Sequence, residues 1–428
     1  MSPLVSLGDT QAAILGAVTR LEAVAVPLAD ALGAVLADAV VAGEPVPPFP
    51  NTAMDGYAVR ADDTVGASAD TPVRLRVVDD LAAGRAPDVA VGPGEAIRIM
   101  TGAPMPDGAD AIVMVERTRR DAAPAGDGGG GGRGEGAGAG EGDGVFVEVE
   151  VPAGQHVRRA GGDLTEGQTV FDAGTRLRAA HVGVLASVGA ATVRVFRRPR
   201  VGVLSTGDEL VESGPLAMGQ IRDSNRPMLL GLVREAGLEP IDLGTVRDDE
   251  DRIVALLEDA FERCDAVLTS GGVSVGDYDF VKAALDRFGA LEWRQVAIKP
   301  AKPLAFGVVR GVPVFGLPGN PVSSLVSFEM FARPALLQMA GQVQCFRPEV
   351  LAIAEHDLTR RPDGKLHLDR VLVRWRDGGY VAGRTGDQSS NVLSATALAN
   401  GLAMLPDGDG VAAGEAVRVM LLDSPPDH

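Results

Sequence analysis

One stretch of this chain alternates between short apolar runs and longer amphipathic runs, and this alternation strongly limits the possible folds. Residues 200–204, 240–246 and 265–269 have the length and composition of buried strands. Between the last two, the apolar residues of 253–261 recur at i, i+3, i+4, i+7 and i+8, the spacing of an amphipathic helix. Strand–helix alternation of this kind predicts a mostly parallel sheet with helices on both faces.

The segments on either side of this α/β stretch are predicted to be mainly β. Asp9 or Thr10 is expected to cap a first helix, and the prolines of residues 41–50 indicate an extended linker. Short β-like runs continue to about residue 167, and a Gly-rich run at 125–144 is expected to form a mobile hairpin extension. After residue 346 the pattern is again β-like, which predicts a small barrel or sandwich.

Charge and residue counts exclude several classes of function. The 428 residues include 40 Lys and Arg against 58 Asp and Glu, a formal net charge of −18, so nucleic acid and membrane surfaces are not expected partners. Cys264 and Cys345 do not make a disulfide framework, and the five histidines are scattered. No run reads as a membrane span or a signal peptide, so the protein is expected to be cytoplasmic. If the ligand is an anion, basic side chains must be gathered locally.

A glycine-rich loop at residues 270–276 follows a predicted strand and precedes a predicted helix. In an open α/β sheet, ligands bind beyond the carboxyl ends of the strands, where glycines expose backbone N–H groups to a phosphate. A tight turn without a ligand is the alternative, and the loop lacks the lysine of a Walker loop. The candidate ligand-binding residues here are Ser270, Gly271, Gly272, Val273 and Ser274.

Carboxylates also follow several of the predicted strands. Glu209, Asp248 and Asp279 lie at three strand ends, which converge at one edge of a sheet. Oxygen ligands of this type predict a site for a hard divalent cation, most simply Mg²⁺ held partly by substrate oxygens. Helix capping is the competing interpretation for Asp248 and Asp279, because Asp is favoured in first helical turns.

Two lysines, Lys299 and Lys302, lie between prolines that stiffen the chain at a strand end. Few lysines occur in this sequence, so their pairing in a rigid loop makes them candidates for binding an anion. A solvated surface pair is the alternative.

Residues 317–323 form a second stiff loop, before a helix predicted at 324–339. Its Pro318, Gly319 and Asn320 are candidates for contacting a ligand, although a simple strand-to-helix turn capped by Ser323 explains them too. In the β-rich part, Asp55 and Thr101 lie in polar turns. These residues are candidates for a site, but their local sequence is also explained by ordinary turns.

Together these segments closely resemble the MoeA and gephyrin E-domain family of molybdopterin molybdenumtransferases. Eight segments occur in the family's order from about residue 51 to 324, with weaker matches to the end, so nearly the whole chain is covered. A single match would be weak, whereas eight collinear ones make chance similarity implausible. The segments are NTAMDGYAV, IMTGAPMPDGADAIVMVE, VRRAGGDL, STGDEL, RDD, SGGVSVGDYD, IKPAKPLAFG and LPGNPVSS.

The resemblance implies a multidomain α/β protein of four parts. In the family an elongated part mediates homodimerisation, and it is followed by a β-rich part, a molybdopterin-binding α/β domain and a C-terminal β-barrel. On this sequence the parts are expected at 1–46 with 168–198, at 47–167 with the insertion 125–144, at 199–345 and at 346–428.

The resemblance also implies an activity. Family members take adenylylated molybdopterin and molybdate, and release AMP as molybdenum enters the dithiolene of the pterin. The expected partners are these small anions, Mg²⁺ as cofactor, a second copy of the chain and, transiently, the molybdopterin adenylyltransferase. The positions matched to the family's functional residues are Asp55, Thr101, Asp163, Glu209, Asp248, Asp279, Lys299, Arg370 and Ser390, with Lys302 in the same motif as Lys299.

Roles follow as hypotheses. The glycine loop and the two lysines would grip phosphate groups, and the three strand-end acids would hold Mg²⁺. Arg370 and Ser390 would cover molybdate or pterin. Asp55 and Thr101 would reach a site across the dimer, as in the family.

One departure and two alternative functions stay open. Members often carry another lysine four residues before the position of Lys299, where this chain has Gln295 with Arg294 beside it. Nucleotide transfer to molybdopterin uses the same α/β domain, but the segments around Asp55 and Thr101 favour insertion. A non-catalytic scaffold would need a fused partner domain, which is not evident in this sequence.

Overall fold

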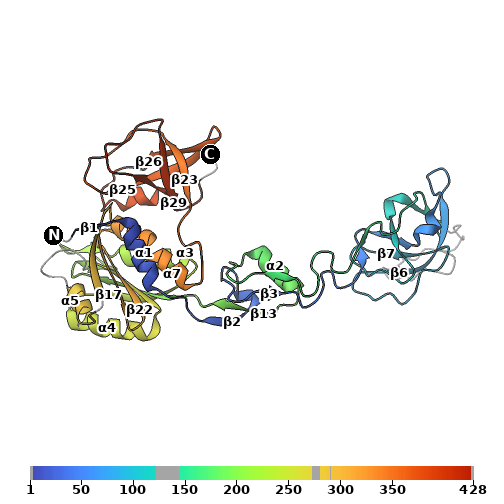
Figure 1. Cartoon of the computed structure of the whole chain (residues 1–428), viewed down its shortest axis with the longest axis horizontal. Helices are drawn as coiled ribbons and strands as arrows, with labels where there is room; N and C mark the ends of the chain where they lie inside the picture. The colour runs from blue at the N-terminus through green and yellow to red at the C-terminus, as the bar shows by residue number, and fades with distance from the viewer. Residues whose placement is uncertain (1–2, 122–143, 272–279, 290, 426–428) are drawn as a thin grey trace.

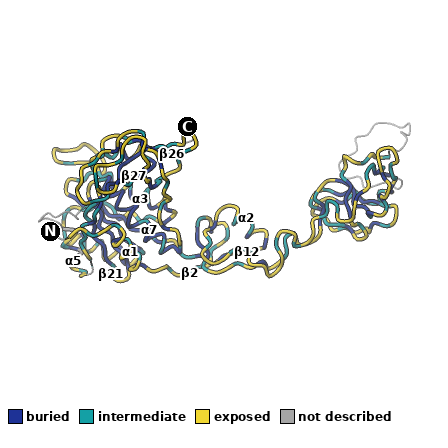
Figure 2. Tube along the Cα trace, turned by 45° about the horizontal axis from the view of Figure 1, so that its top comes forward, coloured by how far each residue is buried: buried dark blue, intermediate teal, exposed yellow. Residues whose placement is uncertain are grey.

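The computed structural model describes residues 3–121, 144–271, 280–289 and 291–425. The molecule is elongated, with an α/β sheet and a β-barrel at one end, a small mixed part in the middle and a six-stranded sheet at the other end (Figure 1). Buried residues are concentrated in the two ends, and the segments that join the parts are mostly exposed (Figure 2). No helix in the described ranges is long and apolar enough to cross a membrane.

The α/β part contains a seven-stranded sheet in the order β1-β19-β21-β22-β18-β14-β17. Neighbours are parallel except for β19–β21 and β21–β22, which confirms the mostly parallel sheet. A short strand pair, β15 with β16, projects beside it. The strands are β1 (Leu4–Val5), β14 (Arg200–Thr206), β15 (Leu210–Val211), β16 (Ile221–Arg222), β17 (Glu239–Val246), β18 (Ala266–Ser270), β19 (Leu291–Val296), β21 (Pro303–Val309) and β22 (Val312–Leu317).

Helices cover both faces of this sheet, as predicted. Along β18, Leu268 packs in the core beneath α3, α6 and α7, whereas its neighbour Val267 packs in the core beneath α4. Successive residues of a strand point to opposite faces, so one strand supplies both cores. The helices are α1 (Leu7–Ala17), α3 (Asn225–Glu235), α4 (Glu250–Arg263), α5 (Phe280–Asp286), α6 (Pro321–Ser327), a π-helix (Phe328–Ala332) and α7 (Arg333–Met339).

Two helix starts differ from the sequence prediction. The side chain of Ser6, not Asp9 or Thr10, caps α1 by accepting a hydrogen bond from the Asp9 N–H at 3.0 Å. The helix after β22 begins at Pro321 rather than at 324, because proline fits the first helical turn, and its N-cap residue is Asn320 rather than Ser323. Gly237 follows α3 with φ of +78°, in keeping with the predicted end of that helix.

The N-terminal helix packs with the α/β part. Ile14 and Val18 are buried in its larger core, and Gln338 Nε2 donates a hydrogen bond to the Leu15 carbonyl at 2.8 Å. The sequence placed residues 1–46 with the elongated part, so the beginning of the chain lies elsewhere than expected. The reason is that the apolar face of α1 packs against α7.

The middle part is built from two antiparallel strand pairs and one helix. Leu36, Leu177, Leu185 and Val193 form its small core. The pairs are β2 with β13 and β3 with β12. The elements are β2 (Ala23–Pro27), the 3₁₀ helix η1 (Leu28–Asp30), β3 (Val40–Val41), β12 (Thr169–Phe171), α2 (Ala179–Ser187) and β13 (Thr192–Phe196).

The far end contains a six-stranded sheet in the order β8-β5-β7-β6-β10-β9. Strands β9 and β10 pair in antiparallel fashion, and most of the Gly-rich run lies between them in the sequence. The hairpin extension predicted for that run lies outside the described residues. The strands of this sheet are β5 (Gly56–Val59), β6 (Val73–Leu81), β7 (Glu95–Ile99), β8 (Ala111–Met114), β9 (Thr118–Arg120) and β10 (Gly144–Val147). A separate antiparallel pair, β4 (Asn51–Thr52) with β11 (Val157–Arg158), and the short 3₁₀ helices η2 (Ala61–Thr64) and η3 (Val115–Arg117) complete this part.

The C-terminal part is a closed β-barrel, in which β27 pairs with both β29 and β25. It also includes a short helix, α8, that the β-like pattern did not predict. The elements are β20 (Ile298–Lys299), β23 (Glu349–Ala354), β24 (Leu358–Thr359), β25 (Leu366–Arg376), β26 (Gly379–Arg384), α8 (Leu393–Ala397), β27 (Gly401–Leu405), β28 (Gly410–Val411) and β29 (Ala416–Leu421).

Candidate functional site

Three loops meet at the carboxyl ends of β14, β18 and β22. The buried Asn225 side chain bridges two of them, since its Nδ2 donates to Ser270 Oγ and to the Gly319 carbonyl, both at 2.7 Å. Gly271 adopts φ of +97°, and a Cβ there would lie 2.7 Å from the Thr206 carbonyl oxygen. Only glycine therefore allows this approach of the loops.

The structure brings two of the predicted acids, Glu209 and Asp248, close together. Burial raises the pKa of Asp248, and the charges of Asp208 and Glu209 raise it further. Asp249, in contrast, caps α4 by accepting a hydrogen bond from the Arg252 N–H at 3.1 Å. Gly272, Val273, Ser274, Asp277 and Asp279 lie outside the described residues.

A cleft of about 930 Å³ lies between the lysine-bearing segment and the barrel. The segment is joined to the barrel by backbone pairing, because β20 runs parallel to β25 with Lys299 opposite His367. Lys299, Lys302, Arg370 and Ser390 all line this cleft, so the fold gathers residues that are far apart in the sequence.

The lining of the cleft is strongly basic for so acidic a protein. It includes seven Lys and Arg side chains against three Asp side chains. Several of these are already paired, as in the bond from Arg384 Nη2 to Asp369 at 2.5 Å. Within the described ranges, Lys299, Lys302 and Arg361 have no carboxylate within ion-pair distance.

Arg370 is fully buried at the cleft and fixes the loop of residues 387–389. Its Nη2 donates to the carbonyls of Asp387 and Ser389 at 3.0 and 3.1 Å, while its Nε has no partner in the described part of the chain. Burial lowers the pKa of this guanidinium. The next carbonyl, that of Ser390, accepts a hydrogen bond from the Val322 N–H at 3.2 Å, so the loop is fixed to the start of α6 as well.

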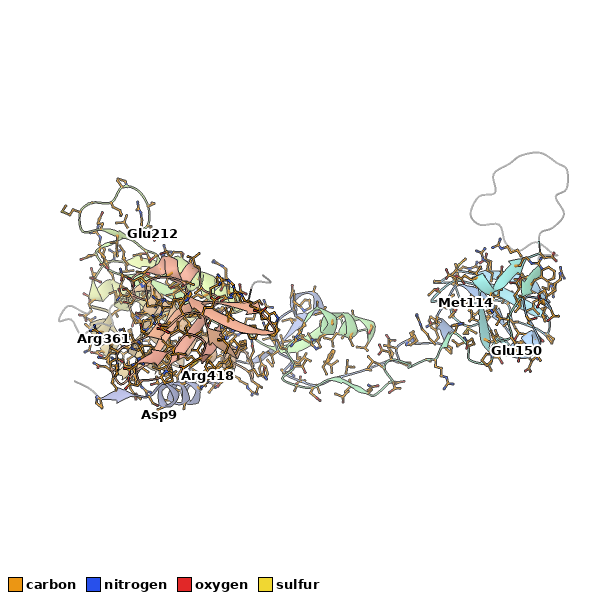
Figure 3. The ribbon with its side chains drawn as sticks, turned by 90° about the horizontal axis from the view of Figure 1, so that it is seen from above. Asp9, Met114, Glu150, Glu212, Arg361 and Arg418 are labelled. Atoms are coloured by element: carbon orange, nitrogen blue, oxygen red, sulfur yellow. The ribbon has the colours of Figure 1, made fainter. Side chains whose placement is uncertain are left out.

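Asp55 and Thr101 form a pair at the other end of the molecule. Asp55 Oδ1 accepts hydrogen bonds from the Thr101 N–H and hydroxyl, both at 2.7 Å, and these bonds lower the pKa of Asp55. Figure 3 shows Met114, whose strand pairs with the residue after Asp55, far from Arg361 in the cleft. A single chain therefore does not bring this pair to the cleft.

Asp163, a predicted site residue, and Arg294, whose role as a substitute for the family lysine was left open, also lie outside the cleft lining. Asp163 is exposed and its N–H donates to the Val46 carbonyl at 2.9 Å. Arg294 hydrogen-bonds to Glu292 Oε2 at 2.5 Å from Nη2, so its guanidinium is occupied on β19. In the loop of residues 317–323, Pro318 is buried, whereas Gly319 and Asn320 are exposed and open to a ligand.

Sequence reasoning missed several residues that shape these sites. Asn225 was not selected, although it stands in a polar Asp-Ser-Asn triplet directly before an apolar helix. Arg360 and Arg361 were also missed, and their adjacency beside Pro362 was the available signal. Asp208 belongs to the STGDEL segment but was not a candidate by itself, and only the structure shows that it lies near Asp248.

Comparison with known proteins places this architecture. Three family models match: the MoeA N-terminal region (domain I and II) over residues 5–189, a probable molybdopterin binding domain over 202–338 and the MoeA C-terminal region (domain IV) over 355–422. Molybdopterin molybdenumtransferase 2 of Mycobacterium tuberculosis is 40% identical over 416 residues, covering 92% of this chain and 94% of the relative. The chain belongs to the MoeA family.

Other relatives match along nearly their whole length. The molybdopterin molybdenumtransferase of Nostoc is 36% identical over 439 residues, covering 98% of this chain and 94% of that protein. The crystal structure of the molybdopterin biosynthesis moeA protein from Pyrococcus horikoshii OT3 has a TM-score of 0.76 and 31% identity, with 98% of this chain and 100% of the other covered. The resemblance noted from the motifs is thus confirmed for the full MoeA architecture.

Proposed function

We propose that this MoeA-family chain is a molybdopterin molybdenumtransferase that inserts molybdate into adenylylated molybdopterin with release of AMP. The observation that carries the proposal is the basic cleft between the α/β part and the barrel. A protein of net charge −18 repels anions at long range, so seven basic residues around one cavity mark a local site for them. Molybdate and the phosphates of the pterin substrate are such anions.

Lys299 and Lys302, which the sequence assigned to phosphate groups, are here assigned to the transferred oxyanion. Both line the cleft without an ion pair in the described ranges, so their ammonium groups are available. Ser390 also lines the cleft, on the loop that Arg370 fixes. The roles of these residues as an oxyanion site follow from charge and position together.

Magnesium fits the acids at the strand ends. No group of three or more His, Cys, Asp or Glu is assembled for a metal within the described residues. Mg²⁺ nevertheless needs only one or two carboxylates when substrate phosphates and water complete its shell. Burial raises the pKa of Asp248 and the charges of Asp208 and Glu209 raise it further, so a cation bound beside these acids would relieve their repulsion. Glu209, Asp248 and Asp279 would hold the ion, which would neutralise charge on the cleaved phosphoanhydride.

A homodimer supplies the remaining residues in this proposal. Asp55 and Thr101 lie at the far end of the molecule, so only a second copy brings such a pair to the cleft. The protein would act in the cytoplasm on small molecules, receiving its substrate from an adenylyltransferase.

The test is the molybdate dependence of AMP release. The full-length protein is incubated with adenylylated molybdopterin and Mg²⁺, with and without molybdate, and AMP is measured by chromatography. AMP release only with molybdate supports the proposal. Equal release without molybdate, or none, contradicts it, and pyrophosphate formation from ATP and molybdopterin would indicate an adenylyltransferase instead.

A further inference from the structure

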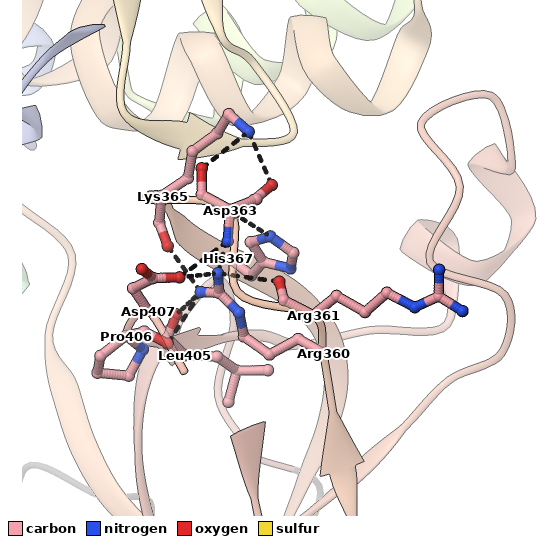
Figure 4. Close-up of polar contacts among 8 residues, drawn as sticks. All are labelled: Arg360, Arg361, Asp363, Lys365, His367, Leu405, Pro406 and Asp407. Atoms are coloured by element: carbon pink, nitrogen blue, oxygen red, sulfur yellow. Dashed lines mark hydrogen bonds and ion pairs between the residues drawn. The ribbon is translucent and has the colours of Figure 1, made fainter. Parts of the chain in front are cut away.

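Arg361 is a basic side chain of the cleft for which the proposed function has no role yet. It is exposed and lines the cavity. In Figure 4 its guanidinium points away from the polar cluster formed by its neighbours. No carboxylate of the described residues pairs with it.

The loop that carries Arg361 is held firmly by the preceding residue. The Arg360 side chain is 1% exposed, and its Nη1 donates to the carbonyls of Lys365, Leu405 and Pro406 at 2.6, 3.0 and 2.8 Å. Its Nη2 donates to Asp363 Oδ1 at 2.9 Å and to Asp407 Oδ1 at 2.7 Å. One buried guanidinium therefore ties both ends of the loop to the barrel.

The other charged side chains of the loop, Asp363 and Lys365, are paired with each other. Asp363 Oδ2 accepts from Lys365 Nζ at 2.7 Å, and Asp363 Oδ1 lies 3.2 Å from His367 Nε2. Although burial opposes it, hydrogen bonds from Lys365 and His367 lower the pKa of Asp363 to about 2, so this carboxylate stays ionised. Burial, together with the charge of Arg360, lowers the pKa of His367 and favours its neutral form. Arg361 is thus the uncompensated charge of the loop.

The size of the cleft calls for more than one anchoring point. Small-molecule sites typically measure about 300–1,000 Å³, and this cleft of about 930 Å³ is at the upper end of that range. A lone oxyanion at Lys299 and Lys302 would leave most of it unfilled. An arginine on a loop held in this way suits a phosphate, because its planar fork can donate two parallel hydrogen bonds and the loop backbone loses little motion on binding.

We propose that Arg361 forms a separate anion subsite at the rim of the cleft, which binds a phosphate group of the pterin substrate while the oxyanion occupies the lysine segment. The proposal rests on the proposed function. It predicts that Arg361 contributes to affinity for the adenylylated pterin and not to affinity for molybdate. Because the guanidinium is exposed, this contribution should weaken with increasing salt.

The test measures equilibrium binding of adenylylated molybdopterin, without molybdate or Mg²⁺, to the wild type and to Arg361→Gln. Loss of a charge-assisted contact should weaken binding about tenfold or more. Arg361→Lys should restore part of it, and the salt dependence should be flatter for Arg361→Gln. Arg376→Gln is the matched control, since Arg376 is an exposed arginine of β25 that pairs with Glu355 outside the cleft. The half-saturating molybdate concentration for AMP release should be the same in all variants.

The outcomes separate this inference from the proposed function. Equal pterin binding by wild type and Arg361→Gln overturns the subsite, as does an equal loss in the Arg376→Gln control. A parallel change in molybdate half-saturation also overturns it. If the wild type binds the pterin but releases no AMP with molybdate, the proposed function fails while the binding comparison still decides the role of Arg361. No binding by the wild type overturns both.

Discussion

Replacing Asn225 with alanine tests whether one side chain organises the loops at the strand ends. The substitution removes both 2.7 Å hydrogen bonds and strands the Ser270 hydroxyl, which is 2% exposed, whereas Gly319 is exposed and its carbonyl can bind water instead. A hydrogen bond contributes about 1 kcal/mol net, and a stranded buried group costs about 1–3 kcal/mol. The truncation also removes Asn225 Oδ1, which is buried without a partner in the described ranges. Losing this unsatisfied oxygen offsets part of the destabilisation. The net loss is estimated at about 2–3 kcal/mol.

Hydrogen exchange measures this loss locally, which suits a multidomain chain better than a single melting temperature. The Gly271 N–H donates to the Leu317 carbonyl at 3.2 Å, so its exchange reports on the joined loops. A loss of about 2–3 kcal/mol should accelerate exchange roughly 30- to 150-fold. Asn400→Ala is the control, since Asn400 is an equally buried amide that bonds the Val373 N–H and carbonyl in the barrel. Unchanged exchange at Gly271 in Asn225→Ala, or equal acceleration in the control, would refute the reasoning.

Three other substitutions have defined outcomes. Because the folded pKa of Asp248 is raised, its ionisation costs stability above that pKa. Asp248→Asn should therefore increase the hydrogen-exchange protection of the α4 amides over the wild type at pH 7, and the difference should vanish as the pH falls towards about 3.8; no difference at pH 7 would contradict the raised pKa. Thr101→Val removes a hydrogen bond that lowers the pKa of Asp55, so NMR titration should show that pKa rising towards its ordinary value, and an unchanged pKa would contradict the pairing. Arg347→Ala leaves Glu329, whose side chain is 1% exposed, without its main partner and should destabilise the α/β part by about 3–5 kcal/mol in denaturant unfolding; a change below about 1 kcal/mol would count against this account.

The α/β part was predictable because its periodicity is strong. The apolar spacing of 253–261 places α4 and its buried face, since Ile253, Leu257, Ala260 and Phe261 are all buried. Convergence of strand ends likewise anticipated that Glu209 and Asp248 lie near each other. Helix starts were less predictable, because proline at a first turn and several polar candidates for a cap gave competing signals.

The cleft itself was not predictable from local pattern. Its geometry depends on β20, two residues that leave the α/β sheet and pair with β25 across the sequence. No periodicity reports a long-range pairing of this length. The same holds for Arg360, whose burial depends on the carbonyls of residues 365 and 405–406 converging on it. Charge counting indicated that an anionic ligand would need basic side chains gathered locally, and only the fold shows where they gather.

The most direct test of the central claim is to locate molybdate in a crystal of the full-length protein by anomalous scattering at the molybdenum edge. We expect a peak in the cleft, within contact of Lys299 and Lys302 and facing the loop that carries Ser390. The peak should disappear in Lys302→Gln crystals soaked under the same conditions. A peak elsewhere with none in the cleft, or a cleft peak that persists in Lys302→Gln at full height, would contradict the assignment of this cleft as the oxyanion site.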